Sequence, residues 1–128
     1  MGDPAIVQGD VITGMCPIHQ IPNPASGVPQ PAPPLPFSAP LTMDLCSTVL
    51  IMGRPAAVLG SWGLNASPHV GLHASDPFLV PSQQRGQILG GSPTVFFGGK
   101  PAAKKVPPPK MCATPGQVSG TAAMVLIG

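Results

Sequence analysis

The sequence of 128 residues contains no tyrosine, no glutamate and very little charge. Only 4% of its residues are aromatic, so large side chains for a hydrophobic core are scarce. Small domains with thin cores often gain stability from a metal ion, disulfide bonds or an oligomeric partner. The only carboxylate side chains are four aspartates: Asp3, Asp10, Asp44 and Asp76. A catalytic mechanism that needs a pair of carboxylates therefore has few residues to draw on.

Long apolar runs, helical patterns and a leader sequence are also missing. The longest apolar run, near Ala122–Ile127, is far shorter than the ~20 residues of a membrane-spanning helix. No window has sustained apolar residues at i, i+3 and i+4. The first residues lack the basic region and apolar core of a secretory signal peptide. We therefore expect a protein that is cytoplasmic when it is made.

Proline and glycine, by contrast, are abundant, with 20 and 16 residues. The chain is nevertheless 43% hydrophobic and only 8% charged, whereas disordered chains are normally polar and charged. These values favour one ordered, loop-rich, all-β domain over residues 1–128. Prolines are densest at 21–40, where we expect an extended polyproline-like loop within the domain. Its PPLP segment, at 33–36, is a possible ligand for a WW or SH3 groove.

One motif occurs twice, 46 residues apart, as TVLIMGRPAA from 48 and TVFFGGKPAA from 94. A weaker third copy is TAAMVLIG at 121–128. Gly98 and Gly99 suit a two-residue hairpin turn, and Pro101 suits the start of a return strand. A turn-rich loop with a histidine or a cysteine precedes each copy. We therefore predict three β-hairpin units whose loops meet at one point. Strands are expected at 5–7, 11–13, 48–52, 56–59, 94–97, 102–106 and 123–127.

The loops before the three copies contain every histidine of the chain, and the third loop contains Cys112. These residues form a plausible closed tetrahedral zinc set: His19, His69, His73 and Cys112. A closed set is structural rather than catalytic. Cys16, three residues before His19, could replace one of the four or pair with Cys46. Alternatively, the histidines are solvent-exposed or bonded to backbone groups. The odd number of cysteines argues against a closed disulfide framework.

Two further groups of residues suggest other functions only weakly. Four lysines lie between 100 and 110, but no aromatic residues alternate with them for stacking on bases, so we expect no nucleic-acid partner. Ser67, His69 and Asp76 are close in sequence, but they lack a nucleophile elbow or an oxyanion-hole context. We therefore predict that the protein is not an enzyme.

The segments GSPTVFFGGKPAAK and VLIMGRPAAV resemble the signature of the PAAR-repeat family, named for Pro-Ala-Ala-Arg. These proteins are spike tips of contractile injection machines, such as type VI secretion systems and related phage-tail-like particles. The resemblance covers most of the chain. Two departures are that Val58 and Lys104 stand where the family motif ends in arginine, and that the proline-rich segment is long.

The resemblance implies a small cone with pseudo-threefold symmetry, which caps a trimeric β-helical spike of the valine-glycine-repeat (VgrG-like) type with one tip per trimer. Its point would hold a zinc ion on the four residues proposed above. Its base would include six residues of the two clear hairpins: Leu50, Ile51, Pro55, Phe96, Phe97 and Pro101. The protein would be a monomer on its own, would leave the cell on the spike and would touch the target membrane transiently.

No effector domain is expected in residues 1–128, so any effector cargo would bind non-covalently. The alternative function is a free-standing zinc-containing or proline-rich binding module that acts as an effector adaptor.

Overall fold

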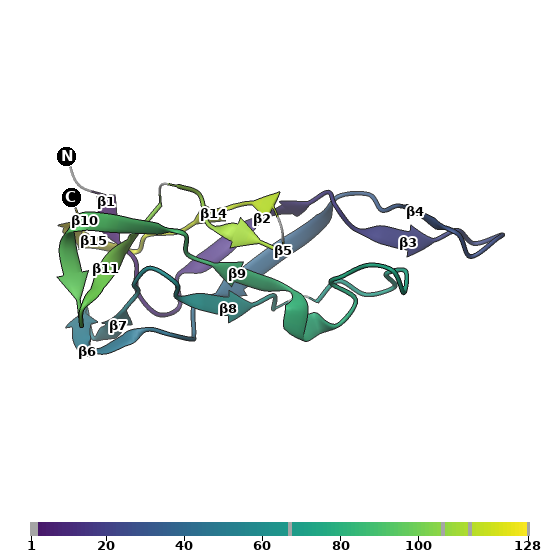
Figure 1. The fold of residues 1–128 in the computed structure, drawn as a ribbon. Coiled ribbons are helices and arrows are strands. Elements are labelled where there is room, and N and C mark those ends of the chain that lie inside the picture. The colour runs from purple at the N-terminus through teal and green to yellow at the C-terminus, as the bar shows by residue number, and fades with distance from the viewer. Residues whose placement is uncertain (1–2, 67, 106, 113, 128) are drawn as a thin grey trace.

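The computed structural model describes residues 3–66, 68–105, 107–112 and 114–127, and its regular structure is almost entirely β (Figure 1). Within these ranges the one helical element is η1 (Pro81–Gln83), a single 3₁₀ turn. The described part of the chain has no helix of the length and apolarity needed to cross a membrane. The predicted all-β, loop-rich fold is confirmed. The molecule is elongated and narrows from one end to the other.

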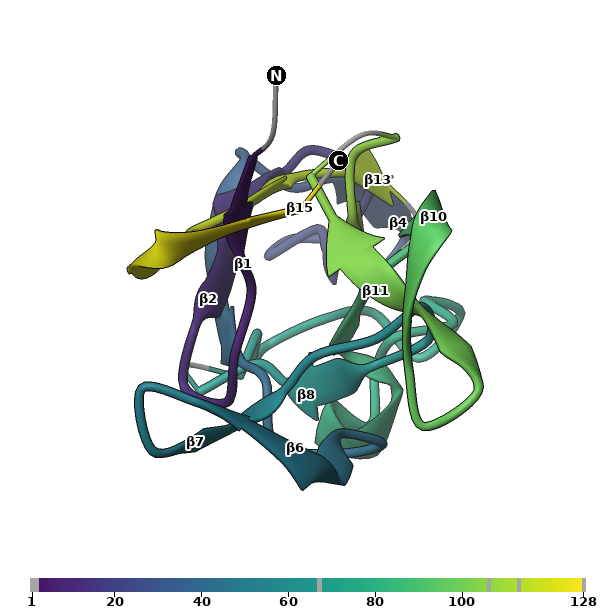
Figure 2. The same cartoon turned by 90° about the vertical axis from the view of Figure 1, so that its left-hand side faces the viewer.

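The broad end consists of three antiparallel two-stranded ribbons, which lie around it in Figure 2. The first ribbon pairs β6 (Cys46–Ile51) with β7 (Arg54–Ala56), and the second pairs β10 (Gly90–Phe97) with β11 (Lys100–Lys104). These are the two hairpins that the repeated motif predicts. The third ribbon pairs β1 (Asp3–Ala5) with β15 (Ala122–Ile127). The weak third copy is therefore completed by the opposite end of the chain.

All three ribbons share one register. In each, a proline lies opposite a large apolar residue, and the next pair joins an apolar residue to a charged one. A bulge follows in every ribbon. The proline pairs are Leu50 with Pro55, Phe96 with Pro101, and Leu126 with Pro4. The sequence DPA at 3–5 thus corresponds to RPA at 54–56 and KPA at 100–102.

The alanines of the motif lie where neighbouring ribbons meet. Ala5, Ala56 and Ala102 are completely buried. Val7 bridges to Ala56, and in the same way Val58 bridges to Ala102. A larger side chain at these positions would hold the ribbons apart, so the small residue after each proline is explained by close packing.

The body of the molecule has a three-stranded sheet and a four-stranded sheet. The first contains β14 (Gln117–Val118), β2 (Val11–Cys16) and β5 (Leu35–Pro40) in that order; the second contains β13 (Thr114–Pro115), β12 (Lys110–Met111), β9 (Arg85–Gln87) and β8 (Trp62–Leu64). Ile12, Phe37, Ile88 and Met111 belong to the core between them. Complete burial of such a side chain contributes about 2 kcal/mol.

The narrow end is the hairpin of β3 (Gln20–Pro22) and β4 (Pro29–Pro31). The prediction of one polyproline-like loop at 21–40 is wrong, because this segment forms most of that hairpin and then β5. Proline is tolerated in these strands because the hairpin is two-stranded, so each strand has an edge that needs no donor. Leu35 and Pro36 of the PPLP segment are paired with β2. Most of the predicted strands fall within β2, β6, β10, β11 and β15. Of the strand predicted at 56–59, residues 57–59 are not part of a named strand. Val106, the last residue of the strand predicted at 102–106, lies outside the described residues.

Candidate metal centre

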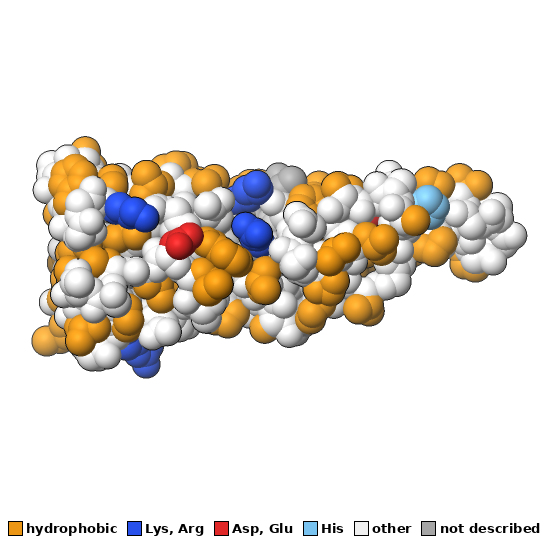
Figure 3. Space-filling model, turned by 60° about the horizontal axis from the view of Figure 1, so that its bottom comes forward, with side chains coloured by type: hydrophobic (Ala, Val, Ile, Leu, Met, Phe, Trp, Pro, Cys, Tyr) orange, Lys and Arg blue, Asp and Glu red, His pale blue; other side chains and the backbone are white. Residues whose placement is uncertain are grey.

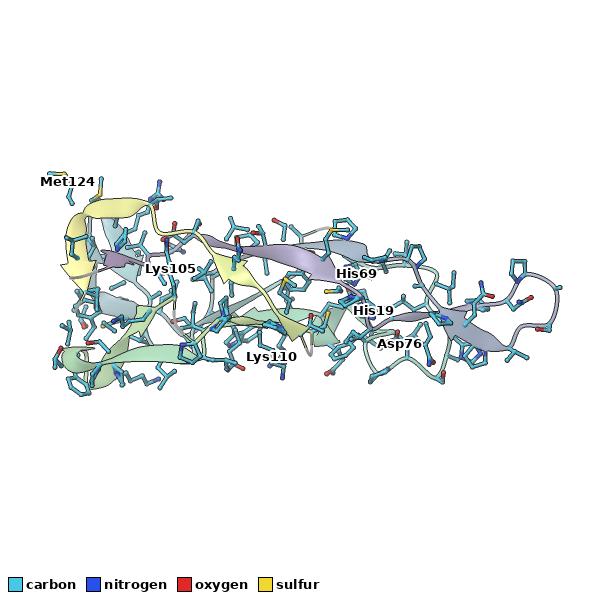
Figure 4. The ribbon with its side chains drawn as sticks, turned by 90° about the horizontal axis from the view of Figure 1, so that it is seen from above. His19, His69, Asp76, Lys105, Lys110 and Met124 are labelled. Carbon is cyan, nitrogen blue, oxygen red and sulfur yellow. The ribbon has the colours of Figure 1, made fainter. Side chains whose placement is uncertain are left out.

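Four buried side chains meet between the body and the narrow hairpin: Cys16, His19, His69 and Cys112. Each offers one nitrogen or sulfur atom, and these atoms all lie within 4.8 Å of one another. Figure 4 shows the imidazoles of His19 and His69 side by side, with Asp76 next to them. Two thiols and two imidazoles are a donor set that could hold a metal ion.

The four side chains come from three segments of the fold, since Cys16 and His19 lie in the same one. Cys16 is the last residue of β2, and His19 immediately precedes β3. His69 lies in the loop between β8 and η1. Cys112 follows β12 with a positive φ of 52°, and its N–H donates to the carbonyl oxygen of Arg85 over 3.0 Å. The cluster therefore links segments that are distant in sequence.

His19 is oriented by a buried carboxylate. Oδ2 of Asp76 lies 3.1 Å from Nδ1 of His19 and accepts the N–H of Gln20 over 2.9 Å, while Oδ1 accepts the N–H of Phe78 over 2.8 Å. Burial alone would raise the pKa of Asp76, but these hydrogen bonds together hold it below its usual value. The ionised carboxylate requires a proton on Nδ1 of His19, so a neutral ring has its lone pair on Nε2.

His69 is oriented in the complementary way. Its Nε2 donates to the carbonyl oxygen of Pro36 over 2.7 Å, so a neutral ring has its lone pair on Nδ1. This Nδ1 lies 2.9 Å from Nε2 of His19. Two lone pairs that face each other need a shared proton or a metal ion between them. Burial lowers the pKa of His69, which disfavours the shared proton.

The two cysteines complete the donor set. Their sulfur atoms lie 3.8 Å apart and share a hydrogen bond. This bond lowers the pKa of Cys16 to about 7 against the effect of burial, and it raises the pKa of Cys112 together with burial. Two thiolates on a tetrahedral zinc ion, each at about 2.3 Å, are themselves about 3.8 Å apart. The spacing of the sulfurs therefore fits a shared metal ion.

His69 is also held through its main chain. Its N–H donates to Oε1 of Gln84 over 2.7 Å, and Nε2 of Gln84 donates back to its carbonyl oxygen over 3.1 Å. Gln84 is completely buried. Sequence reasoning missed Gln84 and gave Asp76 no role beside the metal, because nothing in the local sequence marks either contact. Ser67, the nucleophile considered with His69 and Asp76, lies outside the described residues.

The structure brings three of the four predicted ligands together and leaves His73 apart. Nε2 of His73 donates to the carbonyl oxygen of Gly27 over 3.1 Å, and its Nδ1 accepts the N–H of Ser75 over 3.0 Å. Both ring nitrogens are therefore engaged: Nε2 ties the 73–75 turn to the narrow hairpin, and Nδ1 bonds within the turn. Cys16, named as a possible substitute, occupies the fourth position. All three cysteines are free, so Cys16 does not pair with Cys46.

The resemblance implied a zinc ion at the point of the molecule, but the cluster lies further inside. The β3–β4 hairpin extends beyond His19 and His69 in Figure 4. A metal ion here would join the root of this hairpin to both sheets of the body.

The residues predicted for the base divide into outward and inward positions. Leu50 and Phe96 are 62% and 56% exposed. Ile51, in contrast, is buried, and Phe97 packs partly buried against the same cluster. Pro55 and Pro101 are half-buried. The third ribbon adds Leu126, which is 59% exposed and which the sequence analysis did not include.

Comparisons of the chain with protein-family models, with curated proteins and with solved structures find no match. Any function must therefore be argued from the ribbons and the metal centre themselves.

Proposed function

We propose that this protein is a structural tip, stabilised by zinc, that caps a trimeric β-helical spike of a contractile injection machine. One observation carries the proposal: a large apolar side chain is exposed at the same register position of all three ribbons. These residues are Leu50, Phe96 and Leu126, with 62%, 56% and 59% of their surfaces exposed. Met124, which is the most exposed large apolar side chain in the described part of the chain, lies at the same broad end (Figure 4).

A trimeric β-helix explains why such a surface would be repeated three times. Its end presents three sets of unpaired strand edges, which invite aggregation unless they are covered. Each of the three ribbons can cover one set of these strand edges, so a single copy of the chain would cap a whole trimer. Exposed apolar side chains gathered at one end are typical of an interaction surface.

The opposite end supports a mechanical role. The surface narrows toward the β3–β4 hairpin (Figure 3), where a conical tip would meet a membrane. This hairpin contributes little to the core, so zinc at its root would stiffen it. Two thiolates and two imidazoles favour zinc among common metals, and four protein ligands leave no open position for catalysis. The protein would assemble in the cytoplasm and leave on the spike, with any effector bound non-covalently.

The test is the stoichiometry of binding to a purified trimeric β-helical spike protein from the same organism. Native mass spectrometry should find one copy of this chain per trimer. Phe96→Asp should abolish the complex, because it places a charge in the apolar contact. Val70→Asp is the matched control, since Val70 is 80% exposed in the loop that carries His69.

Three results would contradict the proposal: no complex, a ratio of one chain per spike chain, or equal loss with the two variants. Loss with Val70→Asp alone would favour the adaptor module, which binds through its loops.

A further inference from the structure

Two hollows at the broad end, here called the ribbon clefts, separate neighbouring ribbons. The first cleft, of about 180 Å³, lies between the β1–β15 and β6–β7 ribbons and is lined by Val7, Met52, Arg54, Thr121 and Ala122. The second, of about 190 Å³, lies between the β6–β7 and β10–β11 ribbons and is lined by Asp44, Leu45, Cys46, Val58, Phe97, Gly98 and Lys100.

The two clefts are the same site in successive units. Every residue of the first has its counterpart in the second through the shared register. Val7 and Val58 make the same bridge to an alanine, and Ala122 and Cys46 pair with equivalent alanines. The remaining counterparts are Arg54 with Lys100, Met52 with Gly98, and Thr121 with Leu45.

Each cleft offers one cation beside apolar walls. Arg54 and Lys100 are exposed, and the one ion pair among the described side chains joins His19 to Asp76 instead. None of the described residues that line the first cleft is acidic, but the buried carboxylate of Asp10 lies behind it, where it accepts the N–H of Val7 over 2.9 Å and the hydroxyl of Thr121 over 2.7 Å. Asp44 lines the second, where its Oδ2 accepts the indole N–H of Trp62 over 2.8 Å. The corresponding position of the third ribbon is Asp3, paired with Ile127.

We propose that each ribbon cleft binds a carboxylate carried on a short apolar stem, presented by the docking face of a symmetric partner. The charge of Arg54 and Lys100 selects a carboxylate, and the apolar walls select the stem. A site that recurs in successive units fits a ligand that also recurs, as on a homotrimer. This identification of the partner rests on the proposed function, whereas the carboxylate preference rests on the clefts alone.

The two clefts should differ in strength. Arginine can hold a carboxylate with two parallel hydrogen bonds, whereas lysine acts as a point charge. Asp44 also repels an anion in the second cleft. The two-bond geometry that Arg54 offers therefore makes the first cleft the tighter site.

The first test uses the isotope-labelled full chain and two small probes, hexanoate and its neutral analogue hexanamide, in an NMR titration. Hexanoate should shift the amide signals of Val7, Thr121 and Ala122 at lower concentration than those of Val58, Leu45 and Cys46. Arg54→Ala should remove the first set alone, and Lys100→Ala the second. Lys110→Ala, which changes a basic residue outside both clefts, should alter neither. Equal shifts with hexanamide, or shifts that survive Arg54→Ala, would overturn the proposal.

The second test measures binding to the trimeric spike protein. Arg54→Glu should weaken binding by about tenfold, while Lys110→Glu should have little effect. If wild-type protein shows the hexanoate shifts but does not bind the trimer, the clefts stand and the proposed function fails. If the trimer binds wild type and Arg54→Glu equally well, the docking role of the clefts fails and the proposed function stands.

Discussion

The carboxylate of Asp76 lies 3.1 Å from Nδ1 of His19, with both side chains buried, and so fixes which nitrogen of this ring faces the cluster. Carboxylates behind metal-bound histidines orient the ring and increase its basicity. Asp76→Asn removes the charge with little change in volume. We expect it to weaken metal affinity by about tenfold or more, measured by competition with a coloured chelator.

Asp44→Asn is the matched control for this change. Asp44 accepts a hydrogen bond from Trp62 and lies among the residues of the second ribbon cleft, away from the metal centre. Its substitution should leave metal affinity unchanged. Equal affinity of wild type and Asp76→Asn would show that Asp76 does not position His19.

The choice between Cys16 and His73 as the fourth ligand gives a second prediction. Purified wild-type protein should contain about one zinc ion per chain by elemental analysis. Cys16→Ser and Cys112→Ser should each lower the metal content and the melting temperature, because a structural site with three ligands binds zinc poorly. His73→Ala should keep the metal, since this ring instead bonds Gly27 and Ser75. Loss of zinc with His73→Ala and not with Cys16→Ser would reverse the assignment.

Cys46 is expected to be the reactive thiol of the metal-loaded protein. It is partly exposed, and its pKa is lowered chiefly by a hydrogen bond with the hydroxyl of Thr48, at 3.3 Å, against the opposing effect of burial. The thiolate, which increases as pH rises, is the nucleophile, so a lower pKa shifts alkylation to lower pH. Timed alkylation with iodoacetamide, followed by mass spectrometry, should label Cys46 before Cys16 and Cys112.

Thr48→Val removes the hydroxyl and should shift the pH profile of Cys46 alkylation to higher pH, with slower labelling at neutral pH. Ser47→Ala, on the adjacent exposed residue, is the control. An unchanged profile in Thr48→Val would mean that Thr48 does not stabilise the thiolate.

The two clear hairpins were predictable because turn and strand preferences are local. The Met52–Gly53 and Gly98–Gly99 turns have positive φ angles, and each following strand begins with a basic residue and a proline. The third ribbon was only half predictable from adjacent residues, since its two strands lie at opposite ends of the chain. Matching DPA at 3–5 to RPA at 54–56 would have revealed the missing strand.

The candidate metal centre depends on packing that the sequence does not show. The sequence placed His73 in the predicted ligand set and Cys16 only as a possible substitute, although each lies within a few residues of another histidine. The pairing of β2 with β5 brings Cys16 into the core, while Nε2 of His73 bonds the narrow hairpin at Gly27 and its Nδ1 bonds Ser75. The proline-rich segment was misjudged for a similar reason: its composition favours polyproline conformation, but β2 provides a partner along all six residues of β5.

The contact between the two sheets of the body depends on Gly63. This residue of β8 pairs with Gly86 of β9, and a Cβ atom on it would overlap the carbonyl oxygen of Pro40 and lie 2.8 Å from the carbonyl carbon. Backbone cannot yield as a flexible side chain does, so Gly63→Ala should force β5 and β8 apart. We expect a loss of about 3 kcal/mol in the free energy of unfolding, at the upper end for overpacking.

The measurement is urea unfolding of zinc-loaded protein, where the midpoint should fall with no change in slope. Leu64→Ala is the control, because the neighbouring side chain is 45% exposed and its truncation should cost no more than about 0.5 kcal/mol. A Gly63→Ala variant as stable as Leu64→Ala would show that β5 and β8 can separate at little cost, and the close approach of the two sheets would then not be needed for stability.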